Sequence, residues 1–237
     1  MINIRYFGGK ARTCKEISKI INTYIYNNEL FISPFVGGGW VEQYINTNNK
    51  LLFDKHPYLI DMYKALQKGW IPPTNLTKEE YTYIKNHLDE KPYLSGFVGF
   101  GCSFAGKWFG GYAKDKTRRN YCLNSYNSIL NKMNNGLKNA KFECKDYREL
   151  KPRNAIVYCD PPYKGTTQYS KKIVGNFNTY EFWNIIREWS KYNKIFISEY
   201  NAPDDFECVW QQSVKLDIRN KNNIKEKRIE KLFTYKN

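Results

Sequence analysis

The sequence has few of the residues that build metal centres or disulfide-rich scaffolds. Its two histidines, His56 and His87, stand far apart and outside any carboxylate-rich segment, which argues against a metal-dependent hydrolase. The six cysteines are scattered, without the close pairs of a zinc site or the density of a disulfide framework. We therefore expect reduced cysteines, no bound metal, and a chemistry carried by carboxylates and the backbone.

Long apolar runs are missing as well. No uninterrupted apolar stretch approaches the roughly 20 residues that a membrane-spanning helix needs. The first residues also lack the charged-then-apolar pattern of a signal peptide. The sequence therefore predicts a cytoplasmic protein without a membrane partner.

Acidic residues are scarce beside basic ones. The chain has 23 Asp and Glu against 38 Lys and Arg, which leaves a net charge of +15 and favours a polyanionic partner. Its 237 residues are 41% hydrophobic and 17% aromatic, which excludes disorder as the main state. A chain of this length can form one sizeable α/β core with a modest insertion.

Apolar periodicity predicts alternating helices and strands. Two short strands, at 30–32 and 51–53, flank a glycine turn at 37–39, and a helix is expected directly after that turn. Further strands are expected at 142–144, 155–159, 195–198, 209–214 and 228–235, and further helices at 11–25, 59–66 and 182–189. The order predicts an α/β fold with a Rossmann-like sheet that ends in an antiparallel edge.

The middle of the chain breaks this alternation. Thr77 and Glu80 predict a capping box at the start of a helix. The segment 96–111 holds six glycines among aromatic residues and fits neither a regular helix nor a regular strand. We expect a catalytic domain built from residues 1–70 and 136–237, with residues 71–135 inserted as a mostly helical recognition subdomain.

Acidic residues stand where three of the predicted strands end. Asp54, Asp146 and Asp160 follow these strands, and the glycine turn follows the first one. In an open α/β sheet, ligands bind outside the carboxyl ends of the strands. These residues therefore mark the expected binding edge, although each alone could be a helix cap or a surface carboxylate.

The strongest chemical signal is the sequence Asp160-Pro161-Pro162-Tyr163, directly after an apolar strand. Two prolines fix φ near about −65° and remove two backbone donors, so the Asp160 carboxylate and the Pro161 carbonyl form a rigid pair of acceptors. Such a pair can hold an amino group by both hydrogens and aim its lone pair at an electrophile. Tyr163 can stack on a base. The alternative is a loop merely stiffened by prolines.

This motif resembles that of the Dam-type N6-adenine DNA methyltransferases, and in other segments the chain is similar to phage and prophage members. The resemblance implies S-adenosylmethionine as cofactor, S-adenosylhomocysteine as product, double-stranded DNA as partner, and a bacterial or phage-encoded enzyme. It implies catalytic roles for Asp160, Pro161, Pro162 and Tyr163. The implied cofactor-binding residues are Tyr6, Lys10, Pro34, Phe35, Gly37, Gly39, Asp54, Asp146 and Asp160. Ser33 is a departure, because many relatives have an acidic residue there, and it would weaken or re-route one cofactor contact.

Basic residues near the end of the insertion are candidates for phosphate contact, although a charge run is most often a solvated face. They are Lys107, Lys114, Lys116, Arg118 and Arg119. Nothing in this segment specifies a recognition sequence, and a cognate restriction nuclease and the oligomeric state stay open, with a monomer as the simplest expectation.

The expected reaction is methyl transfer to the N6 amino group of an adenine. The base must leave the duplex, because its amino nitrogen cannot meet the cofactor methyl group inside the stack. Methylation at cytosine C5 is disfavoured, since it needs a nucleophilic cysteine, usually after a proline, and no cysteine here follows one. The alternatives are an amino-methyltransferase acting on DNA cytosine or RNA adenine, and a catalytically silent nucleic-acid-binding module.

Overall fold

A mixed seven-stranded sheet organises the computed structural model, which describes residues 9–113, 120–163, 171–219 and 225–236. The strand order is β3-β2-β1-β4-β5-β7-β6. Five strands are parallel, and β7 pairs antiparallel with both β5 and β6. The bounds are β1 (Phe31–Ser33), β2 (Lys50–Asp54), β3 (Lys141–Cys144), β4 (Ile156–Cys159), β5 (Lys194–Glu199), β6 (Phe206–Arg219) and β7 (Lys225–Tyr235). The predicted α/β sheet with an antiparallel edge is confirmed.

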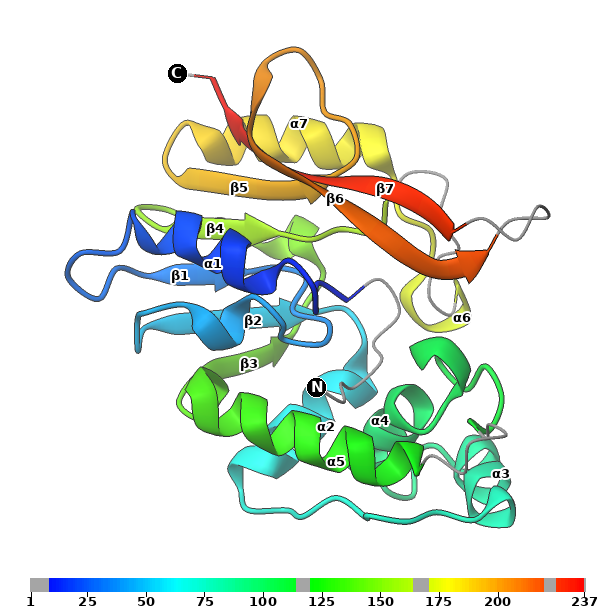
Figure 1. Cartoon of the computed structure of the whole chain (residues 1–237). Coiled ribbons are helices and arrows are strands. Elements are labelled where there is room, and N and C mark those ends of the chain that lie inside the picture. The colour runs from blue at the N-terminus through cyan, green and yellow to red at the C-terminus, as the bar shows by residue number, and fades with distance from the viewer. Residues whose placement is uncertain (1–8, 114–119, 164–170, 220–224, 237) are drawn as a thin grey trace.

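Alternate residues of the central strands enter two separate cores. Phe31 packs in one core with helices α1 (Cys14–Asn22) and α2 (Pro57–Gln67), whereas its neighbour Ile32 packs in the other with α7 (Thr179–Ser190). Successive side chains of a strand point to opposite faces, so a sheet covered on both sides needs apolar residues at every position. Figure 1 shows α1 in front of the sheet and α7 on the opposite side.

The described part of the segment expected as an insertion is helical and lies beyond β3 (Figure 1). It contains α3 (Lys78–Asn86), α4 (Pro92–Gly101) and α5 (Tyr121–Lys132). The predicted capping box is confirmed, because the Thr77 hydroxyl accepts a hydrogen bond from the backbone N–H of Glu80 while the Glu80 side chain accepts one from Thr77.

The expectation for the glycine-rich segment was wrong in its first half, which belongs to the regular helix α4. Glycine disfavours a helix by about 1 kcal/mol relative to alanine, but here it permits close packing. A Cβ atom added at Gly96 would lie 2.0 Å from the carbonyl oxygen of Tyr58 in α2. The approach of the two helices thus offsets the low helix propensity.

The helix expected after the glycine turn is also absent from the structure. Only the short 3-10 turn η1 (Glu42–Tyr44) forms there, and the chain is extended again at Ile45. Both side chains are buried: Glu42 accepts a hydrogen bond from Ser33 at the end of β1, and Gln43 donates one to the Trp40 carbonyl, so they close the loop rather than cover the sheet. The remaining short elements are η2 (Phe104–Gly106), η3 (Met133–Leu137), η4 (Tyr147–Glu149) and α6 (Lys171–Val174).

The parallel strands bring the acidic residues to one edge, as predicted. Because β3, β2, β1 and β4 are neighbours, Asp146, Asp54, the glycine turn and Asp160 follow one another along that edge. The hairpin of β6 and β7 extends past the ends of the parallel strands on the same side (Figure 1). No helix in the described ranges is long and apolar enough to cross a membrane.

The close packing of α4 on α2 gives a first prediction. Gly96→Ala should lower the free energy of unfolding by about 1–3 kcal/mol, because the added methyl group meets backbone rather than a movable side chain. Denaturant titration measures this loss. Lys85→Ala, at an exposed position on α3, is the control and should leave stability unchanged. Equal stability of Gly96→Ala and the parent would contradict the packing described.

Candidate active site

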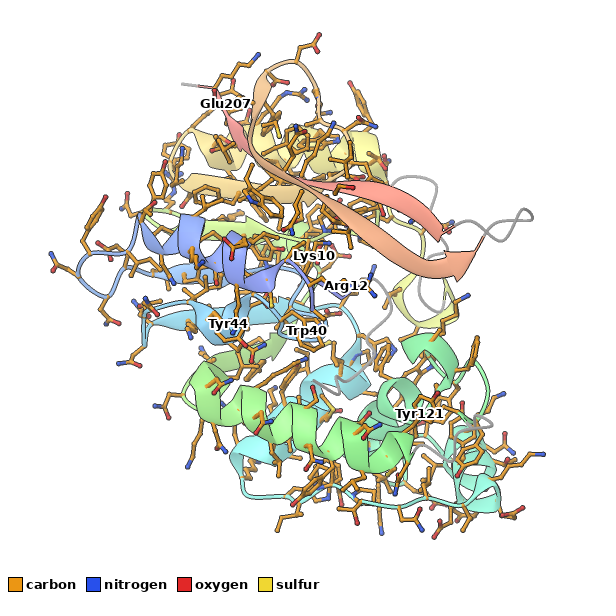
Figure 2. The ribbon with its side chains drawn as sticks, viewed as in Figure 1. Lys10, Arg12, Trp40, Tyr44, Tyr121 and Glu207 are labelled. Carbon is orange, nitrogen blue, oxygen red and sulfur yellow. The ribbon has the colours of Figure 1, made fainter. Side chains whose placement is uncertain are left out.

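An ion pair between Lys10 and Asp160 lies at the centre of the candidate site. The Lys10 ammonium is 2.8 Å from the Asp160 carboxylate, and the two side chains are 5% and 21% exposed. Asp160 follows β4, whereas Lys10 lies just before α1 (Figure 2). Burial raises the pKa of Asp160 above its ordinary value, and Lys10 opposes that rise. The structure thus brings together two residues that the sequence analysis had placed in different motifs.

Glu230 is a third charged member that the sequence analysis missed. It lies on β7, and its carboxylate is 3.5 Å from the Lys10 ammonium. Burial alone would lower the pKa of Lys10, but Asp160 and Glu230 raise it above its ordinary value. No local pattern marks Glu230, because it sits in an ordinary charged run; only the pairing of β7 with β5 carries it to Asp160.

Tyr163 is held by contacts on several sides. Its hydroxyl donates to the Glu230 carboxylate at 3.1 Å, and its ring meets that of Tyr200 edge to face at a centroid distance of 4.6 Å. The Lys10 ammonium lies 4.4 Å from the centroid of the same ring. Tyr200 in turn accepts a hydrogen bond from Arg228. The aromatic residue of the motif is therefore fixed beside the Asp160 carboxylate.

The glycine turn has the backbone that its sequence suggests. Gly37 and Gly39 adopt φ values of 47° and 63°, in the left-handed region that favours glycine. Asp54 accepts hydrogen bonds from the backbone N–H groups of Gly37 at 3.0 Å and of His56 at 2.9 Å. Burial raises the pKa of Asp54 to about 6. Asp54 thus joins the turn after β1 to the end of β2.

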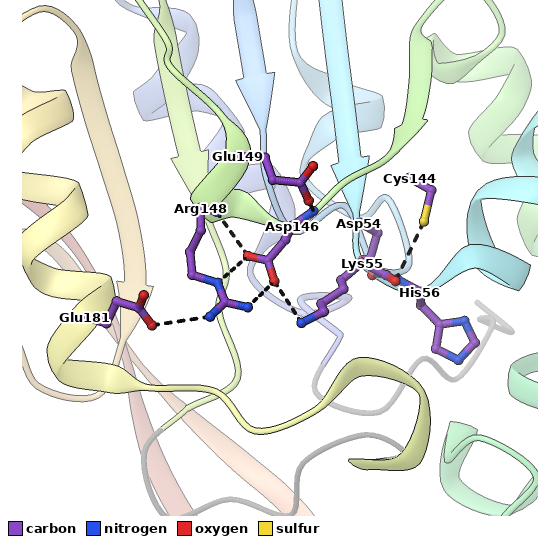
Figure 3. Close-up of polar contacts among 8 residues, drawn as sticks. All are labelled: Asp54, Lys55, His56, Cys144, Asp146, Arg148, Glu149 and Glu181. Atoms are coloured by element: carbon purple, nitrogen blue, oxygen red, sulfur yellow. Dashed lines mark hydrogen bonds and ion pairs between the residues drawn. The ribbon is translucent and has the colours of Figure 1, made fainter.

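Asp146 lies at the far end of the same edge and has cationic partners (Figure 3). One of its oxygens is 2.8 Å from the Lys55 ammonium, and Arg148 binds both oxygens, at 2.6 and 2.9 Å. Burial opposes ionisation, but the bonds from Arg148 and Lys55 lower the pKa of Asp146 below its usual range. The backbone N–H of Arg148 also donates to Asp146 at 3.0 Å, so the roughly four acceptor positions of this carboxylate are already taken.

Ser33, Pro34 and Phe35 lie just before the glycine turn. The buried Ser33 hydroxyl donates to the buried carboxylate of Glu42 at 2.8 Å, and burial raises the pKa of Glu42 to about 7. A carboxyl group therefore lies at the end of β1 despite the serine. Pro34 is buried, and Phe35 packs against Tyr147 at a centroid distance of 5.2 Å, so the structure shows both as part of the packing behind the edge.

Several predicted site residues lie outside the described ranges. They are Tyr6, Lys114, Lys116, Arg118 and Arg119. Lys107, the remaining basic candidate, is exposed on the insertion. The described residues contain no group of three or more His, Cys, Asp or Glu side chains arranged to hold a metal ion.

A family model described as D12 class N6 adenine-specific DNA methyltransferase matches residues 6–99 and 103–229. The chain belongs to this family. It is therefore a DNA adenine methyltransferase that uses S-adenosylmethionine, as the resemblance in its motifs implied. The match spans the glycine turn, the Asp-Pro-Pro-Tyr motif and β6, so both the expected fold and the expected reaction are confirmed.

Curated relatives agree with this assignment. The DNA adenine methylase of Vibrio cholerae is 28% identical over 207 residues, which cover 73% of this chain and 69% of the relative. The DNA N-6-adenine-methyltransferase of Escherichia phage P1 is 26% identical over 200 residues, covering 70% of this chain but only 25% of the relative. Among solved structures, an rRNA methyltransferase of Streptomyces viridochromogenes covers 98% of this chain and 86% of its own, at 9% identity and a TM-score of 0.46.

The buried ion pair gives a second prediction. Lys10→Met should lower the free energy of unfolding by about 3 kcal/mol at pH 8, because it leaves two carboxylates near each other without their cation. The pKa of Asp160 then rises further. A carboxyl group whose pKa is raised in the folded state destabilises the protein as pH increases. The loss of unfolding free energy caused by Lys10→Met should therefore be smaller at pH 5 than at pH 8.

Thermal melts of Lys10→Met at the two pH values test this expectation. Lys19→Met, at an exposed lysine of α1, is the matched control and should melt like the parent at both. A loss for Lys10→Met that does not depend on pH would contradict the assigned role of Asp160.

Proposed function

We propose that the enzyme methylates the N6 amino group of an adenine rotated out of double-stranded DNA, and that Asp160, Pro161, Pro162 and Tyr163 position that base. The observation that carries this assignment is the fixed arrangement of Asp160 and Tyr163 around Lys10. The acceptor pair of Asp160 and the Pro161 carbonyl suits an amino group, and the Tyr163 ring suits the face of a base. Figure 2 shows Lys10 beside the sheet, near the start of α1.

The cofactor is proposed to lie along the edge from Asp160 to Asp146. The donor and acceptor set fits such a ligand: Asp54 offers carboxylate oxygens for hydroxyl groups, and the glycine turn offers backbone at close range. Asp146 would accept an amino group in exchange for one of its present bonds to Lys55 or Arg148. The buried indole N–H of Trp40, just after the glycines, has no hydrogen-bond partner among the described residues. When bound, S-adenosylmethionine supplies an electrophilic methyl group.

Asp160 is proposed to orient the amino group rather than to ionise it. A carboxylate is far too weak a base to deprotonate an aromatic amine before transfer, even with a raised pKa. Hydrogen bonds to Asp160 and the Pro161 carbonyl direct the nitrogen lone pair, and they strengthen as positive charge develops on that nitrogen. Lys10 favours the ionised form of Asp160, the form that accepts hydrogen bonds.

The inserted helices, within residues 71–135, are proposed to recognise the DNA. Lys107 and the basic residues up to Arg119 are the proposed phosphate contacts, in line with the net charge of +15. We take the enzyme to act as a monomer. The same acceptor geometry would also serve a cytosine amino group or an RNA adenine, so the choice of adenine in DNA rests on the family.

Nucleoside mass spectrometry tests the proposed reaction. Unmethylated plasmid and an RNA sample are each incubated with the enzyme and S-adenosylmethionine, and N6-methyladenine is expected in DNA alone. Asp160→Ala should reduce transfer by about 10²–10³-fold or more while cofactor binding persists. Asp204→Ala, at an exposed carboxylate, is the control. Unchanged turnover of Asp160→Ala would refute its catalytic role, and methylcytosine or methylated RNA would change the substrate.

The basic residues of the insertion give a separate prediction. Lys107→Ala should weaken DNA binding about equally for all sequences and reduce the slope of log affinity against log salt by about 0.9. Fluorescence anisotropy over a salt series measures both quantities. Lys85→Ala is the matched control, because Lys85 is exposed on α3 of the same insertion. An unaltered slope for Lys107→Ala would remove it from the phosphate contacts.

A further inference from the structure

Lys132 is a buried lysine of the insertion whose ammonium group reaches the glycine turn. It is the last residue of α5 and is 2% exposed. Its ammonium donates a hydrogen bond to the carbonyl oxygen of Gly38 at 2.6 Å and lies 3.3 Å from the centroid of the Trp40 ring. Trp40 lies between the sheet and α5 (Figure 2).

Stability alone does not account for a lysine at this place. Burial lowers the pKa of Lys132 to about 7, which is the mark of an ammonium group placed in unfavourable surroundings. Glu42 opposes that shift, but no contact within ion-pair distance joins it to Lys132 among the described residues. Replacing a buried charge by an apolar side chain of similar volume is often neutral or stabilising. A lysine is therefore not needed here to fill the core.

The backbone of the glycine turn is held by hydrogen bonds from several parts of the chain. Three of its polar groups have partners within the catalytic domain: the Gly37 N–H bonds to Asp54, the Gly37 carbonyl accepts from Tyr63, and the Gly39 N–H bonds to Val36. The Gly38 carbonyl is held by Lys132 instead. Glycine loses more conformational freedom on ordering than any other residue. The lysine thus fixes the central peptide of the turn before a ligand arrives.

We propose that Lys132 is a positioning residue that pre-organises the glycine turn for the cofactor, so that the insertion controls cofactor affinity. The inference rests on the proposed placement of S-adenosylmethionine at this turn. A loop that is already ordered binds its ligand without a further ordering cost. The contact also joins segments 94 residues apart, which connects the recognition subdomain to the cofactor site.

Calorimetry and steady-state kinetics of Lys132→Met test the proposal. The Kd and the KM for S-adenosylmethionine should both rise about tenfold or more, while kcat at saturating cofactor stays within about threefold and the melting temperature does not fall. Lys138→Met removes an exposed lysine six positions further along and should change none of these values. Lys132→Arg, which keeps a buried cation and donor, should restore part of the affinity.

A second variant tests whether the effect of Lys132→Met comes from a folding defect. Lys132→Gln is shorter and uncharged, and it should show the same loss of cofactor affinity. A folded Lys132→Met or Lys132→Gln with parental Kd would overturn the proposal, and so would failure of both variants to fold, because Lys132 would then be structural. Binding of S-adenosylmethionine to the wild-type protein is measured first. If the wild type does not bind it, the proposed cofactor site is rejected and this inference with it. If the wild type binds and the variants bind with the same Kd, only the role of Lys132 is rejected.

Discussion

Asp160 is a carboxylate largely withdrawn from water, and the structure around it serves to keep it charged and in place. A buried carboxylate without a partner would take up a proton. Lys10 opposes this at a distance of 2.8 Å, and Glu230 on β7 contacts the same lysine. Tyr163 then bonds to Glu230, so the aromatic ring takes its position from the same charges. The charged groups at this edge of the sheet are therefore paired with one another.

Buried charge recurs behind the glycine turn. Glu42 and Lys132 are each 2% exposed. Burial raises the pKa of Glu42 to about 7 and lowers the pKa of Lys132 to about 7. Glu42 bonds to Ser33 at the end of β1, and Lys132 bonds to Gly38 in the glycine turn. Such groups cost stability unless they are fully hydrogen-bonded, and they fix a single geometry when they are. The glycine turn is consequently held by Lys132 on its buried side as well as by Asp54 at the edge of the sheet.

Local sequence patterns predicted those helices and strands whose formation depends on neighbouring residues. The strands around Ile32, Leu52 and Val157 follow from apolar runs, and the capping box at Thr77 follows from two residues three positions apart. Local patterns failed where packing overrides propensity. Gly96 permits the approach of α4 to α2, and the buried Glu42 closes a loop where a helix was expected.

The sequence by itself determined the Asp-Pro-Pro-Tyr motif, the glycine turn, the acidic residues at the strand ends and, through them, the family and its reaction. These features are contiguous, or they follow from the rule that parallel strands end at one edge. Tertiary structure alone decided that Glu230 meets Tyr163 across 67 residues and that Lys132 meets Gly38 across 94. The pairing of β7 with β5 and the packing of the insertion create these contacts, and periodicity cannot encode them because it describes only neighbours along the chain.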